Sequence, residues 1–251
     1  MIINSSPIIV LDSGVGGISL VKLLHKTFKN ENFIYVADNE FMPYGNKNES
    51  ALKKRLEKIV DTMIKTYHIK MVVLACNTAT MVGLKHLQSK FKIPIYGVNP
   101  IQDIPNNAVV ICTKLTGKEL SKRHFLNFEK AEQNNLQCKY LMLPKLANYI
   151  ENNFFDKKKI NKKVKEIIAK YHLNDYKNIV LGCTHYELIG QYFKENLTNS
   201  KVILPSKNTL KNIQKDQILE QIDSKSIGTV YFLSTIPSKS YVDKMYYIFS
   251  H

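Results

Sequence analysis

Short apolar runs alternate with helix-length amphipathic segments along most of the 251-residue chain. The runs at residues 7–11, 33–37 and 71–75 have the length and composition of buried strands, and Ser50 is placed to cap a helix that ends near His68. Parallel strands need long crossover connections, which helices usually provide. The alternation therefore predicts an α/β fold in which helices cover a mostly parallel sheet.

The alternation restarts after Asn99-Pro100. The later runs that we interpret as strands are residues 108–112, 139–143, 178–182, 201–204 and 229–233. The last of these strands and an apolar helix at residues 241–249 are expected to pack back on the first half of the chain. We therefore predict two similar lobes, with residues 1–98 plus 208–251 in lobe A and residues 99–207 in lobe B.

Two segments of the chain are counterparts of one another. Residues 72–78 and 179–185 each contain an apolar strand that ends in a small residue, followed by a cysteine and then polar groups. In parallel α/β sheets the ligand lies beyond the carboxyl ends of the strands. Cys76 and Cys183 are therefore expected at binding edges, and two facing lobes would bring them together.

A pair of opposed thiols suits inversion at an α-carbon, because one base removes the proton while the other donates one. Backbone N–H groups at a helix start stabilise a thiolate, so we expect such a thiol to have a pKa below about 8.5. A free cysteine is more often a small buried hydrophobe, which is our interpretation of Cys112 and Cys138. A hydrolytic pair of Cys183 and His185 is a competing interpretation, although residues two apart need not face each other.

A glycine-containing loop at residues 12–17 follows the first predicted strand. The loop lacks both the G-x-G-x-x-G spacing and the lysine of phosphate-binding loops, so nucleotide binding is not expected. A helix start suits a carboxylate equally well, and Ser13 adds a side-chain donor. Asp12 could assist Cys76 or cap the helix, and His185 could assist Cys183 or be a surface residue.

The formal net charge is +15, from 36 Lys and Arg against 21 Asp and Glu. Such a balance suits nucleic acid or an acidic surface, but the lysines are spread over helix faces such as residues 157–165, without interleaved arginine and aromatic residues. We interpret them as a solvated surface and expect no nucleic-acid partner. A positive molecule would also attract an acidic substrate.

Neither a secretory signal nor a membrane-spanning stretch is apparent in the sequence, which predicts a cytoplasmic protein without a membrane partner. The four cysteines have no metal-ligand spacing, so we expect no metal site. In a reducing cytosol the cysteines should remain thiols.

The motifs of the chain resemble those of bacterial glutamate racemases, in the wider aspartate/glutamate racemase superfamily, over nearly the whole length. The segments that carry the resemblance are L-D-S-G-V-G-G at residues 11–17, P-Y-G at 43–45, A-C-N-T-A at 75–79 and L-G-C-T-H-Y at 181–186. They follow the family's order and approximate spacing. The resemblance implies two similar lobes with the active site between them.

The resemblance also implies an isomerase that interconverts L-glutamate and D-glutamate without pyridoxal phosphate or any other cofactor, and without a metal. It implies that Cys76 and Cys183 transfer the proton with the assistance of Asp12 and His185. The product would be D-glutamate for peptidoglycan, and the protein would be a homodimer. The substrate contacts that it implies are Asp12, Ser13, Tyr44, Gly45, Asn77, Thr78, Thr116 and Thr184.

Several positions depart from the family's pattern. Phe41 stands where the family usually has arginine, and Lys118-Glu119 changes the sequence after Thr116. The family has an acidic residue about three positions after Pro144, where this chain has Ala147, and the sequence leaves open whether Glu151, one helical turn later, replaces it. Two alternatives therefore remain: a racemase for aspartate or several amino acids, and an inactive amino-acid-binding or regulatory relative.

Overall fold

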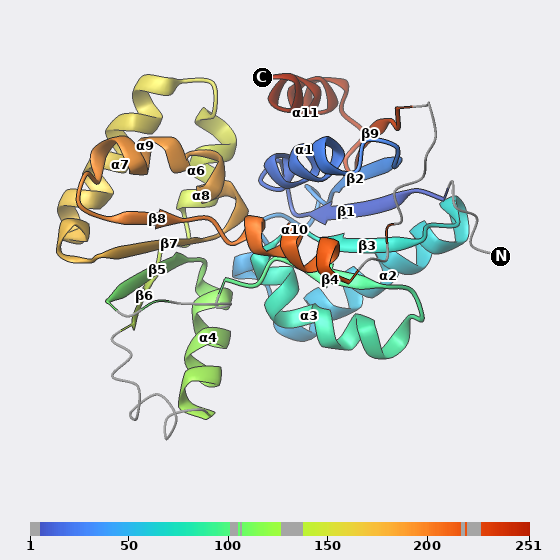
Figure 1. Ribbon diagram of the computed structural model, residues 1–251, viewed down its shortest axis with the longest axis horizontal. Coiled ribbons are helices and arrows are strands. Elements are labelled where there is room, and N and C mark those ends of the chain that lie inside the picture. Colours follow the sequence, from blue (N-terminus) through green and yellow to red (C-terminus); the bar gives the residue numbers. More distant parts are fainter. Residues whose placement is uncertain (1–5, 101–104, 106, 127–137, 217–218, 220–226) are drawn as a thin grey trace.

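Two parallel β-sheets organise the chain, and each lies at the centre of one lobe (Figure 1). The computed structural model describes residues 6–100, 105, 107–126, 138–216, 219 and 227–251. The larger sheet has the strand order β4-β3-β1-β2-β9, the smaller one has the order β6-β5-β7-β8, and every pairing is parallel. The prediction of an α/β fold with two sheet-based lobes is confirmed.

The larger sheet contains the first four strands and the last one. These strands are β1 (Ile8–Asp12), β2 (Phe33–Ala37), β3 (Met71–Leu74), β4 (Ile95–Gly97) and β9 (Val230–Ser234). The helical segments of this lobe are α1 (Ile18–Thr27), the short 3-10 helix η1 (Tyr44–Asn46), α2 (Glu49–Tyr67), α3 (Asn77–Lys90), α10 (Ser206–Lys215) and α11 (Lys239–Ser250).

The smaller sheet contains the strands of the middle of the chain. They are β5 (Ala108–Cys112), β6 (Cys138–Met142), β7 (Asn178–Gly182) and β8 (Lys201–Ile203). The helical segments of this lobe are α4 (Lys114–Leu126), α6 (Leu146–Asn153), α7 (Lys157–Lys170), the 3-10 helix η2 (Leu173–Asp175), α8 (Thr184–Leu188) and α9 (Gly190–Asn196).

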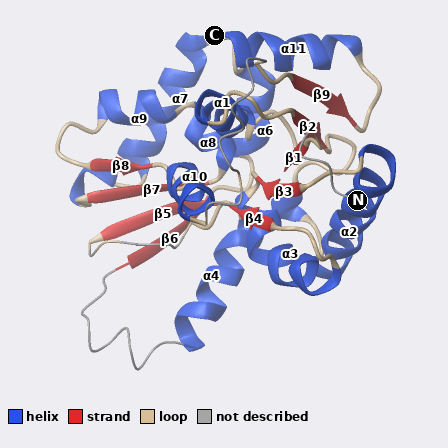
Figure 2. Cartoon of the chain, turned by 45° about the vertical axis from the view of Figure 1, so that its right-hand side comes forward, coloured by secondary structure: helices blue, strands red, loops and turns tan. Residues whose placement is uncertain are grey.

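Alternate side chains of β1 enter two separate apolar clusters, as the two-residue period of a strand requires. Ile8 and Val10 pack in the cluster that includes α1 and α11, whereas Ile9 and Leu11 pack in the cluster that includes α2 and α3. All residues of β1, β2 and β3 are buried. Helices therefore cover both faces of the larger sheet, which is why its strands are continuous apolar runs (Figure 2).

The smaller sheet has one extensive and one limited apolar face. Val109 and Ile111 of β5 pack in a large cluster with α6, α7 and α9. The opposite face holds Val110 and Cys112, which pack with Leu120 of α4 and with Met81, a residue of α3 in the other lobe. This face of the smaller sheet therefore takes part in the contact between the lobes.

The end of the chain returns to the larger lobe, as predicted. Strand β9 pairs with β2, and α11 packs against α1 and β9. In Figure 1, α11 lies at the top of the molecule, above α1. The residue numbers at which one lobe passes into the other stay a prediction.

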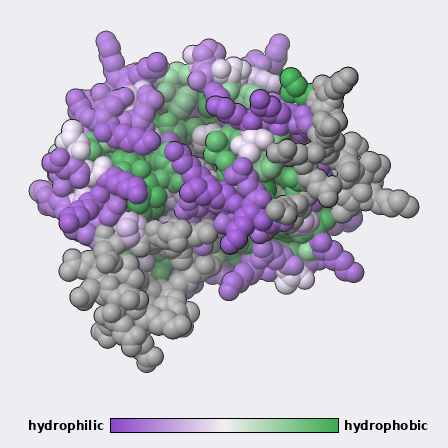
Figure 3. Space-filling view, in the orientation of Figure 1, coloured by the Kyte–Doolittle hydropathy of each residue, from purple (hydrophilic) through white to green (hydrophobic). Residues whose placement is uncertain are grey.

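Some local expectations differ from the structure. Ser50 does not cap α2: the side chain of Asn48 accepts the backbone N–H groups of Ser50 and Ala51, which makes Asn48 the capping residue. The sequence also does not predict α4, α6 or α10. Among the described residues, no helix combines the length and the apolar character that crossing a membrane would require. On the face shown in Figure 3, hydrophilic residues are spread over both lobes.

Candidate active site

The strand order reverses once in each sheet, and the candidate residues lie at these reversals. The chain runs from β1 to β2 on one side and returns to β3 on the other, and it does the same from β5 to β6 and β7. In open α/β sheets the ligand crevice lies outside the carboxyl ends of the strands at such a reversal. At the reversal in the larger sheet, Asp12 ends β1 and Cys76 follows β3. At the reversal in the smaller sheet, Thr113 follows β5 and Cys183 follows β7.

Cys76 is a buried residue at the start of α3, with 6% of its surface exposed. Burial raises the pKa of its thiol, and the negative charges of Asp12 and Cys183 raise it further, against backbone hydrogen bonds from Ala79 and Thr78. The expectation that the pKa of Cys76 lies below its usual value is therefore wrong. Its apolar surroundings outweigh two N–H donors, because burial disfavours the charged form.

Cys183 is equally buried, at the start of α8, but its neighbour is the imidazole of His185. Burial lowers the pKa of His185, yet hydrogen bonds with Cys183 and Glu151 and the negative charges of both raise it well above its usual value. An imidazolium therefore faces Cys183. Cys183 is close enough to Cys76 to influence the pKa of its thiol, so the two cysteines lie near each other.

Glu151, the acidic residue that follows Ala147 by one helical turn, contacts His185 directly. Oε2 of Glu151 lies 2.6 Å from Nε2 of His185 and accepts the backbone N–H of Val15 at 3.4 Å. Glu151 follows Ala147 by four residues on α6, and residues four apart share one face of a helix. The carboxylate of Glu151 therefore lies on the same face of α6 as Ala147, one turn further along the helix.

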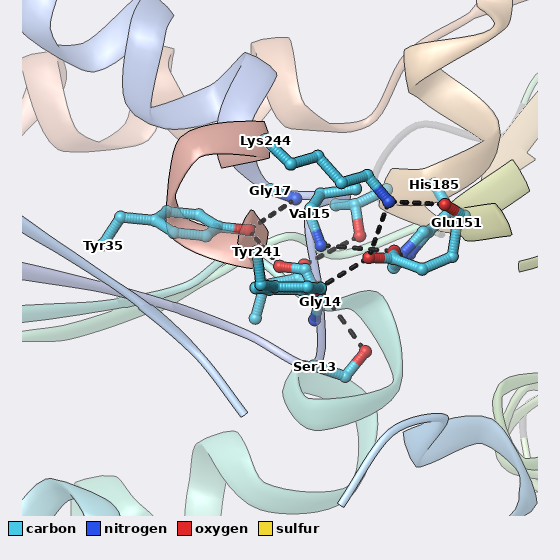
Figure 4. A network of polar contacts seen from close by, with 11 residues as sticks. Ser13, Gly14, Val15, Gly17, Tyr35, Glu151, His185, Tyr241 and Lys244 are labelled. Carbon is cyan, nitrogen blue, oxygen red and sulfur yellow. Dashed lines mark hydrogen bonds and ion pairs between the residues drawn. The ribbon is translucent and has the colours of Figure 1, made fainter. Parts of the chain in front are cut away.

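The carboxylate of Glu151 is held by donors from several elements (Figure 4). Oε1 accepts the hydroxyl of Tyr241 at 2.8 Å and lies 3.5 Å from Nζ of Lys244. Burial opposes ionisation of Glu151, but the hydrogen bond and charge of His185, the charge of Lys244 and the hydrogen bond of Tyr241 lower its pKa to about 2. Glu151 is therefore ionised beside a protonated His185.

Asp12 joins the two lobes rather than capping α1. Its Oδ2 accepts the hydroxyl of Thr184 at 2.9 Å, and its Oδ1 accepts the backbone N–H of Gly14 at 3.0 Å. The hydroxyl of Ser13 also lies 3.5 Å from Oδ1. Burial raises the pKa of Asp12, while the charge of His185 and these hydrogen bonds oppose the rise.

The glycines of the loop after β1 allow the two lobes to approach closely. A Cβ atom on Gly14 would lie 2.9 Å from Oε2 of Glu151, and one on Gly16 would lie 2.6 Å from Nδ1 of His185 and 2.8 Å from its backbone nitrogen. Real Cβ atoms essentially never come that close to other atoms. The loop that resembles a phosphate cradle in sequence therefore accommodates side chains of the other lobe.

Three threonine hydroxyls form a buried cluster between the lobes. Oγ1 of Thr78 lies 3.0 Å from that of Thr113 and 2.9 Å from that of Thr116, and the last two are 3.0 Å apart. Beside them, Asn77 donates to the carbonyl of Val98, while its buried Oδ1 has no hydrogen-bond partner among the described residues. An unsatisfied buried acceptor costs about 1–3 kcal/mol, so a ligand N–H group would be stabilised there.

Tyr44 uses its hydroxyl within the protein. It donates to Oδ2 of Asp38 at 2.8 Å, and Asp38 also forms an ion pair with Arg55 of α2. The guanidinium of Arg55 lies 5.7 Å from the ring centre of Phe41, the residue that replaces the family's arginine. Arg55 thus brings a guanidinium to this turn from another element. Gly45 packs directly against Thr113, where a Cβ atom would collide.

Some residues of the site carry no sequence signal that could have identified them. Tyr35 donates to the carbonyl of Gly14 and accepts the N–H of Gly17, which fixes the loop, but in sequence Tyr35 is one more apolar strand residue. Tyr241 and Lys244 stand in a C-terminal helix far from every motif. Among the described residues, no three His, Cys, Asp or Glu side chains are grouped as metal ligands would be.

Glutamate racemases stand out among the proteins that this chain resembles. A glutamate racemase of Clostridium botulinum (strain Langeland) is 30% identical over 258 residues, covering 100% of this chain and 99% of that protein. One of Halothermothrix orenii is 31% identical over 236 residues, covering 90% and 91%. No protein-family model matches the chain.

Solved structures agree with these relatives. A glutamate racemase isoform of Bacillus anthracis superposes with a TM-score of 0.81 at 26% identity, covering 97% of this chain and 93% of that one. The fold is also that of the Francisella tularensis glutamate racemase solved in complex with D-glutamate, with a TM-score of 0.80 at 23% identity and coverage of 99% and 95%.

Proposed function

The chain belongs to the glutamate racemase family, and on that premise we propose that it interconverts L-glutamate and D-glutamate by proton transfer between Cys76 and Cys183. One observation supports this assignment above all. The two thiols follow strands at the reversals of the two lobes, and both are buried at helix starts.

In the proposed reaction one thiolate removes the α-proton, so that a C–H bond breaks and an S–H bond forms. The thiol on the opposite side gives its proton to the other face of the carbanion, so that the product has the inverted configuration. The thiol and the thiolate have then exchanged roles. His185, held by Glu151, brings its imidazole beside Cys183, whereas burial and the charge of Asp12 raise the pKa of Cys76.

The remaining polar groups are proposed as the substrate contacts. Oδ1 of Asn77 suits the ammonium group, because it is a buried acceptor that nothing among the described residues satisfies. The hydroxyls of Thr78, Thr116 and Thr184 and the backbone of Ser13 suit the carboxylates. The set is completed by Asp12, and by Tyr44 and Gly45 through their backbone. Donors aimed at the α-carboxylate would stabilise the charge that develops next to the carbanion.

The contact between Glu151 and His185 makes the two alternative functions less well supported. A racemase for aspartate or several amino acids, and an inactive relative, were suggested by Ala147 in the place of an acidic residue. Because Glu151 supplies a carboxylate to His185 from the next helical turn, His185 does not lack an acidic partner. A comparison of turnover with L-glutamate and L-aspartate separates the substrates.

The proposal is tested by α-proton exchange in deuterated water with L- and D-glutamate. Wild type is expected to exchange and invert both enantiomers. Cys76→Ala and Cys183→Ala should lose racemisation while circular dichroism shows an intact fold, and the control Cys138→Ala should retain it. Binding of glutamate by wild type without exchange would reject the reaction, and near-wild-type racemisation by either site variant would reject the two-base assignment.

Three further statements belong to the same proposal. The product supplies D-glutamate for peptidoglycan, the protein acts in the cytoplasm, and it forms a homodimer, as the family resemblance implies. Light scattering of the purified protein tests the assembly. The lobes are proposed to divide as residues 1–98 plus 208–251 and residues 99–207, which limited proteolysis can test.

A further inference from the structure

Two side chains of the C-terminal helix converge on the carboxylate that supports His185 (Figure 4). Resting on the proposed function, we infer that Tyr241 and Lys244 of α11 are positioning residues for the half of the reaction that Cys183 carries out. They hold Glu151 ionised and oriented, and through Glu151 they fix His185 beside Cys183. The helix that closes the larger lobe thereby becomes part of the proton-transfer machinery of the smaller one.

The two carboxylate oxygens of Glu151 have different partners. Oε2 faces His185 and the backbone N–H of Val15, while Oε1 faces Tyr241 and Lys244. Donors on Oε1 prevent the carboxylate from turning, so Oε2 stays directed at the imidazole. The side chain of Glu151 is only 4% exposed, so water cannot easily replace a lost donor.

Lys244 also binds the backbone of the residue whose side chain it neutralises. Its Nζ lies 2.5 Å from the carbonyl oxygen of Glu151, near the end of α6. The last carbonyls of a helix lack partners within it, and a cation is favourable at that end. Lys244 therefore anchors the end of α6 to α11 and supplies positive charge to the same residue.

The charges around the site explain why a second cation is needed. The ionisable groups around Glu151 are His185 of α8, Tyr241 and Lys244 of α11, Asp12 at the end of β1 and Tyr35 of β2. Cys183 then adjoins His185. Without Lys244, the two buried carboxylates of Glu151 and Asp12 would share one imidazolium, and burial of unpaired charge is costly.

The contacts of α11 lie on the Cys183 side of the site. Within the described ranges, no hydrogen bond or ion pair joins α11 to Cys76, whereas Tyr241 and Lys244 reach Cys183 through Glu151 and His185. Loss of either residue should therefore slow proton transfer by Cys183 more than proton transfer by Cys76. A merely structural role for α11 would slow both equally.

The test uses the full chain and glutamate deuterated at the α-carbon, with racemisation followed from the L and the D enantiomer. The variants are Tyr241→Phe, which removes one hydroxyl, and Lys244→Met, which removes the cation; Lys244→Arg keeps the charge. The matched controls on the same helix are Tyr247→Phe, whose side chain is about half exposed, and the exposed Lys239→Met.

Lys244→Met is expected to lower kcat about tenfold or more, the effect of one lost charge-assisted contact, with little change in KM. Tyr241→Phe should have a smaller effect in the same direction, and Lys244→Arg should retain more activity than Lys244→Met. The deuterium isotope effect should rise with the enantiomer whose proton Cys183 removes and fall with the other, while the two controls match wild type.

Isotope effects that stay at the wild-type values in both directions, or that change equally in both, would overturn the inference while leaving the proposed function intact. A wild type that does not racemise glutamate would overturn the proposed function and this inference with it. Thermal unfolding of each variant identifies loss of fold, and Tyr241→Phe, which deletes a single oxygen atom, still decides the question if Lys244→Met does not fold.

Discussion

Cys76 and Cys183 follow equivalent strands of the two lobes and are equally buried, yet their surroundings have opposite electrostatic character. Cys76 lies in an apolar cluster with the carboxylate of Asp12 nearby, and its pKa is raised. Cys183 adjoins His185, whose pKa is raised by its hydrogen bonds with Cys183 and Glu151. The local strand–cysteine–helix unit thus sets where each thiol lies, and residues from other elements set the charges around it.

This difference has a consequence for the reaction cycle. In the proposed reaction, the raised pKa of Cys76 favours the direction in which Cys76 starts as a thiol. The reverse direction needs a thiolate beside Asp12. The ammonium group of the substrate can provide compensating positive charge there, because an opposite charge within a few ångströms favours the ionised form.

The largest expected effect on kcat comes from a substitution of His185, the neighbour of Cys183. His185→Gln keeps a polar side chain of similar size but cannot carry a positive charge or exchange a proton beside Cys183. We expect kcat to fall by about 10²- to 10⁴-fold, the range of general acid–base contributions. Steady-state racemisation measured by circular dichroism checks this, and a loss below about threefold would contradict the role of His185.

A smaller effect is expected from moving the supporting carboxylate along α6. Glu151→Ala should lower kcat about 10- to 100-fold, as the loss of an orienting partner typically does. Because Ala147 lies on the same face one turn earlier, the double variant Ala147→Glu/Glu151→Ala should recover part of this loss. No recovery in the double variant, in a protein that still folds, would mean that the position of Glu151 itself is required.

Much of this site could be predicted from the sequence, and the part that could not has a physical reason. Cys76 and Cys183 were identifiable because a strand end and a helix start are local features that apolar periodicity reveals. Glu151 remained undecided because sequence spacing places it one turn away from the expected position, and only the packing of α6 shows which turn faces His185. Tyr241 and Lys244 could not be found, because their contacts join segments about 90 residues apart.

The fold shows the same division between local and distant information. Strands β2, β5 and β7 begin and end where the apolar runs predict, because strands covered on both faces are uniformly apolar. The pKa of Cys76 was wrongly expected to fall, because the helix start is visible in sequence whereas the apolar cluster and Asp12 come from other elements. Sequence therefore predicts positions better than it predicts electrostatic surroundings.

The pH dependence of the free energy of unfolding tests the ionised state of Glu151, which lies on the Cys183 side of the site. The pKa of Glu151 is lowered from 4.5 to about 2, so its ionised form stabilises the folded state above pH 4.5, and this contribution is lost as the pH falls toward about 2. Glu151→Gln should remove it, which flattens the fall of the free energy of unfolding by up to about 3 kcal/mol. Urea unfolding of both proteins between those pH values checks the slope, and equal slopes would contradict the assignment.

The smallest effect is expected on the Cys76 side, where Asp12→Asn removes a negative charge without removing the acceptor for Thr184. Because the charge of Asp12 raises the pKa of Cys76, the variant should have a lower thiol pKa, although burial keeps it above the usual value. Alkylation of each cysteine against pH, followed by peptide mass spectrometry, should show the midpoint of Cys76 moving to lower pH. The pKa of Cys138 is raised by burial alone, to about 11, so its profile should not move. A shift of both profiles would indicate a general opening of the structure, and a Cys76 midpoint that stays in place would show that Asp12 does not set the difference between the two thiols.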